Sequence, residues 1–228
     1  MVWKLKKALY GLPQAPRLYY LTFDAVAYKL GLKRAETDPC IYYKTDSSGS
    51  TVLVLNVHVD DNYIIGEQEH VERLMEDVRE EFHVKDLGDV QEYLGIECIP
   101  DSEGDIHLSQ RSKIHQVAEK FEVERLPTPY SPHIAKRLPN TEEKDEDIPY
   151  NQLVGDLVYI TRGTRPEVTH NLMDLSRHLQ HYDKRHWEAG LRVIKFLNGT
   201  SNISLPMKAL DTERVIEVWT GSDHVGAL

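Results

Sequence analysis

The residues best suited to chemistry in this sequence are two adjacent carboxylates. Asp60 and Asp61 lie between two apolar stretches, residues 51–57 and 63–65. Carboxylate oxygens are the ligands that Mg²⁺ prefers, and the ion keeps waters and substrate phosphates in its other positions. In phosphoryl transfer, two such ions hold the attacking and leaving oxygens. The pair therefore predicts a divalent-metal site; the alternative is a polar β-turn, because Asp tolerates turn geometry.

The elements around the acidic pair predict a hairpin. Successive side chains of a strand point to opposite faces, so adjacent carboxylates serve one site only at a tight turn. A further apolar run, residues 40–44, precedes residues 51–57 after a polar loop. We expect three antiparallel strands in succession, with Asp60 and Asp61 at the tip of the second hairpin.

Two helices and a second hairpin complete the first half of the chain. Residues 16–31 predict a helix that begins at Pro16 and ends at Gly31. Residues 68–82 have apolar residues at spacings of three and four, typical of an amphipathic helix. Residues 93–99 and 105–108 predict two strands. Residues 1–109 are thus expected to form helices packed on one antiparallel sheet, an α+β arrangement.

The second half predicts mainly helices. A stretch with five prolines and an acidic run, residues 127–149, is expected to be an irregular linker. Asp183 is expected to cap the last helix, and residues 215–222 return to strand character. The helical segments are residues 110–122, 151–162, 166–180 and 184–198.

The composition argues against several classes of protein but does not indicate a particular function. No stretch approaches the ~20 apolar residues of a membrane span, and the N-terminus lacks the apolar core of a signal peptide, so a secreted protein is not expected. Cys40 and Cys98 have no metal-ligand spacing and are expected to be buried free thiols in a reducing compartment. His178, His181 and His186 are expected to be surface residues.

The net charge does not indicate a nucleic-acid binder. The formal net charge is −10 at pH 7, whereas nucleic-acid-binding domains are usually basic. The basic residues fall in small groups that are expected to be solvated helix faces. Only sequence motifs can therefore indicate that this chain binds nucleic acid.

Ordered motifs along the chain resemble one family. Residues 4–17 read K-L-K-K-A-L-Y-G-L-P-Q-A-P-R, the acidic pair follows, and K-D-L-G (85–88) precedes Y-L-G-I-E (93–97). Later blocks are Y-N-Q-L-V-G, T-R-P-E, L-S-R and H-W-E-A. Together these resemble the reverse transcriptase, an RNA-directed DNA polymerase, of copia-type LTR retrotransposon Pol polyproteins.

The resemblance implies a polymerase site. Asp60 would be a catalytic metal ligand and Asp61 a second, outer carboxylate, with two Mg²⁺ or Mn²⁺ ions in the family enzyme. Gln14 would lie beside the incoming nucleotide; the alternative is that it caps the helix at 16–31. Tyr93, Leu94, Gly95 and Ile96 would form a primer-grip-like hairpin, for which the alternative is an ordinary sheet edge.

The resemblance also implies a domain organisation. Residues 1–109 would be part of the palm, an antiparallel sheet packed with helices. Residues 110–214 would be a mostly helical thumb and connection region that includes the linker at 127–149. Residues 215–228 would begin an RNase H domain, with Asp223 as its first acid.

Departures from the family pattern bear on activity. His58 stands where the family normally has Tyr and can become charged near neutral pH; Pro13 and Tyr19 also depart. The family's first polymerase aspartate, on an Asp-Val-x-x-Ala-Phe-Leu type of strand, has no counterpart in these residues. By itself the chain is therefore expected to be inactive.

Two functions remain open at this stage. The first is a fragment of a retrotransposon polymerase whose partners are an RNA template, a DNA primer, dNTPs and the rest of the Pol polyprotein, with no membrane. Its expected location is the cytoplasm, a virus-like particle or the nucleus. The alternative is an inactive remnant that at most binds nucleic acid or protein.

Overall fold

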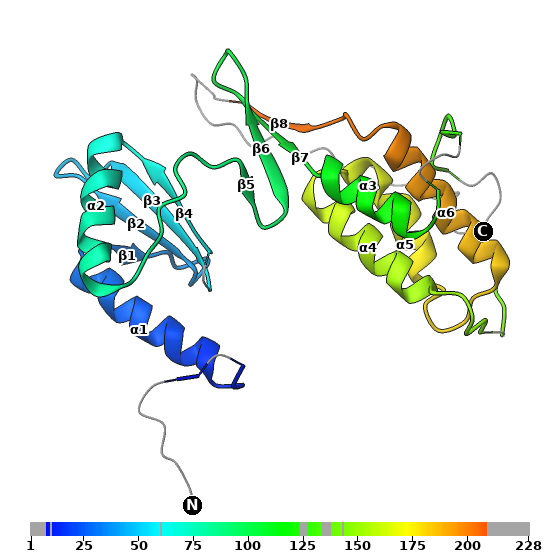
Figure 1. Ribbon diagram of the computed structural model, residues 1–228, viewed down its shortest axis with the longest axis horizontal. Coiled ribbons are helices and arrows are strands. Elements are labelled where there is room, and N and C mark those ends of the chain that lie inside the picture. Colours follow the sequence, from blue (N-terminus) through cyan, green and yellow to red (C-terminus); the bar gives the residue numbers. More distant parts are fainter. Residues whose placement is uncertain are drawn as a thin grey trace, which may run out of the picture. The chain divides into compact units, whose positions relative to one another are not determined.

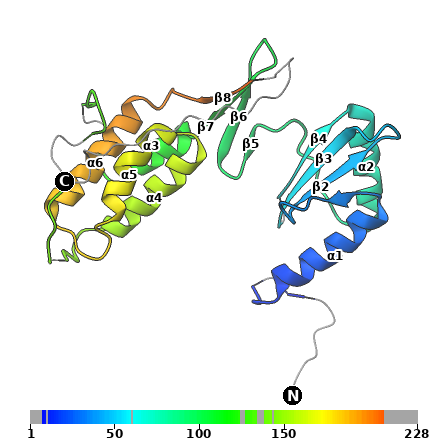
Figure 2. The ribbon, with the colours of Figure 1, turned by 180° about the vertical axis from the view of Figure 1, so that it is seen from behind.

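The structure is a computed structural model that describes residues 8–9, 11–59, 61–123, 127–133, 138–142 and 144–208. The chain divides into two compact units, Met1–Leu94 and Gly95–Leu228. Figures 1 and 2 show the elements of each unit from two sides. Both units combine helices with antiparallel strands, so the expected α+β class is confirmed.

The first unit contains a four-stranded antiparallel sheet in the order β1-β2-β3-β4. The three expected strands are β2 (Ile41–Thr45), β3 (Thr51–His58) and β4 (Asp61–Gly66). A short β1 (Lys33–Arg34) adds an edge that the sequence did not predict, because two polar residues carry no period-2 pattern.

One face of this sheet is covered by two helices, α1 (Ala15–Lys29) and α2 (Gln68–Glu81). Leu53, Leu55 and Val57 alternate along β3 and are buried against them. Helix α2 contributes the apolar stripe predicted from its spacing, centred on buried Leu74. The first core is therefore a two-layer one.

Helix α1 ends as its sequence predicts. Gly31 adopts a φ of 80°, and its backbone N–H donates to the carbonyl of Tyr28 while that of Leu32 donates to Ala27. Glycine adopts this left-handed conformation at no steric cost. The turn directs the chain into β1.

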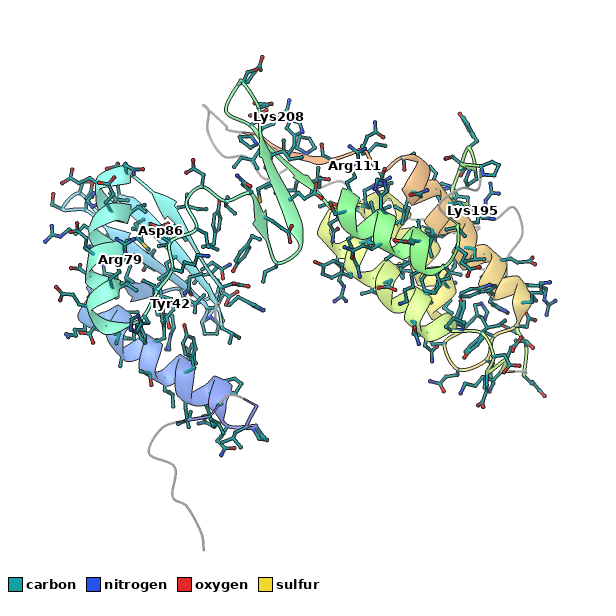
Figure 3. All side chains as sticks on the ribbon, viewed as in Figure 1. Tyr42, Arg79, Asp86, Arg111, Lys195 and Lys208 are labelled. Atoms are coloured by element: carbon teal, nitrogen blue, oxygen red, sulfur yellow. The ribbon has the colours of Figure 1, made fainter. Side chains whose placement is uncertain are left out.

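A polar cluster ties α1 to the sheet. The buried Tyr42 hydroxyl donates to Asp24 Oδ1 at 2.8 Å, and Arg34 Nη1 lies 3.2 Å from the same oxygen. Burial and the Asp24 charge raise the pKa of Tyr42, so its proton stays in place. Figure 3 labels Tyr42 in this unit.

The segment after α2 is held by an ion pair. Arg79 Nη2 lies 3.2 Å from Asp86 Oδ2, and Asp86 Oδ1 accepts a hydrogen bond from the Gly88 backbone at 2.9 Å. Both labelled side chains are visible in Figure 3. These contacts give the K-D-L-G motif a structural role: its acid closes a turn.

Strand β4 has no strand partner on its outer edge among the described residues. Ile65 on this strand is 56% exposed. Open apolar edges are recognised aggregation sites.

We expect the 228-residue chain to bind a hydrophobic dye, and Ile65→Thr to lower both dye fluorescence and light scattering. The matched control, Ile203→Thr, replaces an exposed isoleucine that belongs to the second unit and not to β4; an equal drop in that variant would contradict the assignment.

The second unit is built on a helical core. Its helices are α3 (Arg111–Lys120), α4 (Tyr150–Gly163), the short η1 (Pro166–Val168), α5 (Thr169–Ser176) and α6 (Lys184–Gly199). All four helical segments expected from the sequence are present, but the one predicted at 166–180 is divided into η1 and α5 and ends earlier. Ile114, Leu153, Leu157, Leu175 and Leu197 are among the residues that are at most 1% exposed in this core.

A second antiparallel arrangement lies beside these helices. Strand β6 (Ile96–Pro100) pairs with β7 (Ile106–Ser109), which pairs with β8 (Leu205–Met207). The expectation of one sheet over residues 1–109 is therefore wrong. The β6–β7 hairpin belongs to the second compact unit and has its own sheet.

The described parts of residues 127–149 are irregular, as expected, but they contact the helices of the second unit. The Asn171 side chain donates to the Pro132 carbonyl at 3.2 Å, and Arg192 Nε donates to the carbonyl of His133 at 3.1 Å. Thr128 packs so closely on α6 that Gly199 has no room for a side chain. The described parts of this segment, called the strap below, therefore lie across the helices.

A buried arginine joins the start of η1 to the end of α6. Arg165 is 0% exposed; its Nε lies 2.5 Å from Glu167 Oε1, and Nη1 and Nη2 donate to the carbonyl and hydroxyl of Thr200 at 3.1 and 2.7 Å. A buried charge is stable only when paired and hydrogen-bonded. The arginine of the T-R-P-E motif is therefore a structural one.

The histidine prediction is wrong for two of three residues. His186 is fully buried, with Nε2 3.0 Å from the carbonyl oxygen of Pro139. His178 is half-buried, its ring 4.3 Å from that of His186, and burial lowers the pKa of His178. Only His181 is exposed. Helical spacing alone did not reveal that the strap covers His186.

Asp183 caps α6 as predicted. Its Oδ1 accepts from the Arg185 backbone at 2.8 Å, and the His186 side chain completes a capping box. We expect Asp183→Ala to lower the free energy of unfolding by about 1 kcal/mol at pH 7. The hydrogen bonds from Arg185 lower the pKa of Asp183, so its stabilisation is present above the unfolded-chain pKa of about 4 and is lost as pH falls through the folded value.

Urea unfolding of wild type and variant from pH 7 to pH 3 measures this effect. The difference should shrink at the acid end, and Asp183→Asn, which keeps a capping oxygen, should cost less than Asp183→Ala at pH 7. A difference that grows on acidification would contradict the role of the charged cap.

Candidate functional site

The β3–β4 hairpin presents the predicted site residues at one end of the first sheet. The two strands stay in register through Leu55↔Ile64 to the last pair, His58↔Asp61. The turn thus contains only two residues, as expected for a tight hairpin. Val59 is exposed and has a φ of 53°, which is rare for a β-branched residue. Asp60 lies outside the described residues, and Asp61 is the first residue of β4.

The alternation of side chains places Asp61 on the face away from α1 and α2. Ile64 packs with the helix-covered core, so Asp61 and Tyr63 point to the opposite face. Asn56 and His58 share this face, because they pair with Tyr63 and Asp61. One carboxylate, one imidazole, one amide and one phenol therefore gather on the open face at the end of the hairpin.

Tyr93 extends this open face. Its ring lies 5.5 Å from that of Tyr63 at an interplanar angle of 31°. Burial, then the negative charge of Asp61, raises the pKa of Tyr93, so its hydroxyl keeps its proton at neutral pH. That hydroxyl is buried and has no hydrogen-bond partner among the described residues. The Tyr93 ring therefore lies against Tyr63, and the charge of Asp61 acts on its hydroxyl.

The strand expected over residues 93–99 is interrupted. Strand β5 is only Glu92–Tyr93, and the chain turns at Leu94 (φ 51°) and Gly95 (φ 75°) before β6. Two successive positive φ values are typical of a type I′ turn, for which glycine is favoured. A side chain at Gly95 would also collide with the Tyr159 hydroxyl. Leu94 is exposed and Ile96 half-buried.

The glutamate that ends Y-L-G-I-E has a structural partner that the sequence did not reveal. Glu97 Oε1 accepts hydrogen bonds from the Ser112 backbone at 3.1 Å and hydroxyl at 2.6 Å. These bonds hold the pKa of Glu97 below its usual range and satisfy a free N–H in the first turn of α3. The motif links the hairpin to α3.

Gln14 occupies the N-cap position of α1 and is exposed, but its side chain makes no capping hydrogen bond. The alternative role as a helix cap therefore finds no support in the geometry. Asp223 and the strand expected at 215–222 lie outside the described residues.

The two cysteines are free, as expected. Cys40 is exposed rather than buried, and Cys98 is half-buried. Cys40 directly precedes β2, where side-chain burial begins only at the strand itself. Within the described part of the chain, no helix is long and apolar enough to cross a membrane.

The end of the β3–β4 hairpin offers a divalent ion suitable oxygen donors, but few of them among the described residues. Asp61 offers hard oxygen atoms at an exposed position, which fits Mg²⁺. Among the described residues, no three potential ligands converge. The described side chains therefore fit an ion that takes part of its coordination from water and substrate, as Mg²⁺ does.

Comparison with known proteins decides the family. The family model described as reverse transcriptase (RNA-dependent DNA polymerase) matches residues 1–135. The chain belongs to this family. Among curated proteins, the retrovirus-related Pol polyprotein from transposon TNT 1-94 of Nicotiana tabacum is 33% identical over 99% of this chain and 18% of its own length. The expected resemblance to copia-type Pol polyproteins is confirmed.

Other relatives extend the similarity to two more organisms. A protein attributed to transposon Ty5-1 of Saccharomyces cerevisiae is 27% identical over 98% of this chain and 73% of its own length. The retrovirus-related Pol polyprotein from transposon RE1 of Arabidopsis thaliana is 28% identical over 92% of this chain and 14% of its own length. This chain thus spans less than a fifth of the tobacco and Arabidopsis polyproteins. No solved structure matches it.

Proposed function

We propose that the chain is the part of a retrotransposon RNA-directed DNA polymerase that carries the carboxylate pair of the nucleotidyl-transfer site. The observation that supports this most directly is the two-residue turn between His58 and Asp61, at the exposed end of an antiparallel hairpin, in a chain of the reverse transcriptase family. A tight turn is the backbone arrangement in which adjacent carboxylates can serve one site.

In this proposal Asp60 and Asp61 hold divalent ions, Mg²⁺ or Mn²⁺, of which the family enzyme uses two. When bound, such ions stabilise the charge that develops on transferring phosphoryl groups. Asp61 supplies oxygen ligands, and Tyr93, whose ring lies against that of Tyr63, keeps its hydroxyl protonated under the charge of Asp61. The chain's own residues therefore bind and orient the ions.

The nucleic acid and nucleotide contacts are assigned by the same proposal. Gln14 lies beside the incoming dNTP, and its exposed side chain, which makes no capping hydrogen bond, supports such a contact. Tyr93, Leu94, Gly95 and Ile96 position the primer end; their tight turn, with exposed Leu94 at its tip, supports a loop that touches a ligand. Residues 1–109 belong to the palm, and residues 110–214 to the thumb and connection.

The partners in this proposal are an RNA template, a DNA primer and the remaining Pol segments, including an RNase H domain that begins at 215–228 with Asp223 as its first acid. The site of action is the cytoplasm, a virus-like particle or the nucleus. Template-directed dNTP incorporation by the chain, supplied with an upstream segment that carries the first aspartate, tests the proposal. No incorporation by that mixture would favour an inactive remnant that only binds nucleic acid or protein.

A further inference from the structure

A histidine stands directly opposite the Asp61 carboxylate. His58 and Asp61 are the last register pair of the β3–β4 hairpin, and both side chains are exposed. Directly opposite residues on one face of a sheet have Cβ atoms about 4.5–5.5 Å apart. An imidazole and a carboxylate at this separation can reach a common ion.

Both side chains are available to such an ion. Neither His58 nor Asp61 forms a side-chain hydrogen bond or ion pair with another described residue. The pairs His70–Glu67 and His170–Asp174 differ in this respect, because there the imidazole already lies 3.6 and 3.4 Å from a carboxylate. The hairpin end thus carries, on one face, one nitrogen ligand and one oxygen ligand that have no partner among the described residues.

We propose that His58 is a ligand of the same divalent ion as Asp61, which makes this site prefer Mn²⁺ and later transition metals to Mg²⁺. The proposal rests on the proposed function only for the assignment of Asp61 to metal binding. His58 is a departure from the family pattern, in which a tyrosine occupies this position, so the preference belongs to this chain.

The chemistry of the two donors gives the reason. Mg²⁺ favours oxygen ligands and gains little from an imidazole nitrogen. Affinity for mixed nitrogen and oxygen sites rises from Mn²⁺ towards the later metals of the first transition row. Two protein ligands leave most coordination positions to water or substrate phosphates, which is compatible with the absence of three converging ligands among the described residues.

Paramagnetic broadening tests the assignment without any need for activity. Substoichiometric Mn²⁺ is added to the 228-residue chain, and the imidazole Cε1–H signals are followed by NMR, with His58→Tyr identifying the His58 signal. We expect the His58 signal to broaden before that of His83, an exposed histidine of the same unit. Asp61→Asn should reduce this broadening. Equal broadening of the two histidines would overturn the proposal.

Metal affinities give an independent readout. Calorimetric titration should show that His58→Tyr raises the Kd for Mn²⁺ by roughly tenfold and changes the Kd for Mg²⁺ by less than about twofold. Both substitutions lie at exposed hairpin positions, where stability changes are small. If His58→Tyr leaves the Mn²⁺ Kd unchanged while Asp61→Asn raises it, His58 is not a ligand and the proposed function stands. If Asp61→Asn changes neither metal's Kd, the role of Asp61 in the proposed function fails as well.

Discussion

Primer extension by the 228-residue chain alone is expected to be at least about a thousandfold slower than by the same chain supplied with the upstream aspartate strand. Single electrostatic groups in active sites contribute about 3–4 kcal/mol to transition-state stabilisation. Each 1.4 kcal/mol corresponds to about a tenfold change in rate. The absent carboxylate would both position the two ions and stabilise the charge of the transition state, so more than one such contribution is missing, which corresponds to about a thousandfold or more in rate.

The physical basis is the geometry of adjacent side chains. Asp60 and Asp61 lie at neighbouring positions, and Asp61 already belongs to β4. Neighbouring side chains diverge, so a carboxylate that bridges two ions is expected from another strand. The described residues contain no group of three converging ligands that could replace it.

The assay is extension of a labelled DNA primer on an RNA template with Mg²⁺ or Mn²⁺. In the supplemented mixture, Asp60→Ala should return the rate to that of the chain alone, whereas the exposed control Glu103→Ala should have no effect. Robust extension by the chain alone that Asp60→Ala abolishes would contradict the prediction. Another residue would then supply the third carboxylate.

Replacement of Arg165 is expected to lower the free energy of unfolding by about 3 kcal/mol or more. Arg165→Met keeps much of the side-chain volume but removes the guanidinium that bonds both the carbonyl and the hydroxyl of Thr200. The substitution removes the donors to the Thr200 carbonyl and hydroxyl together, and each acceptor left without its donor at a buried site costs about 1–3 kcal/mol. The loss also detaches the end of α6 from η1.

Urea unfolding followed by the helical circular dichroism signal measures this change. The matched variant is Glu167→Gln, which keeps an oxygen for Arg165 Nε and alters a side chain that is 42% exposed. It should cost less than about 1 kcal/mol, as exposed ion pairs usually do. An Arg165→Met variant as stable as wild type would show that the T-R-P-E arginine serves a ligand rather than the fold.

Local patterns predicted most of the elements, but not their ends. The stripe of α2, Gly31 after α1 and the cap at Asp183 each depend on residues within one or two turns. The β3–β4 hairpin was likewise visible as two apolar runs around a short acidic turn. In these places the sequence carries the whole physical cause, so the prediction needed no tertiary information.

Long-range pairing escaped prediction. Strand β8 pairs Leu205 with Leu108, almost a hundred residues earlier, and a three-residue strand has no detectable period. The strap at 127–149 looked like a linker because its prolines exclude regular structure, yet its carbonyls are bound by Asn171, His186 and Arg192. The same strap covers His186, which explains why that histidine was wrongly assigned to the surface.

The sequence by itself determined the family, through ordered motifs, and the hairpin that carries Asp61, through alternation around a short turn. The tertiary structure decided which face Asp61, His58 and Tyr63 share and that Tyr93 lies beside them. It also decided that Arg165 and Glu97 serve the fold. The reason is that motif identity and turn chemistry are local, whereas burial and the partners of polar groups depend on segments brought together only when the chain folds.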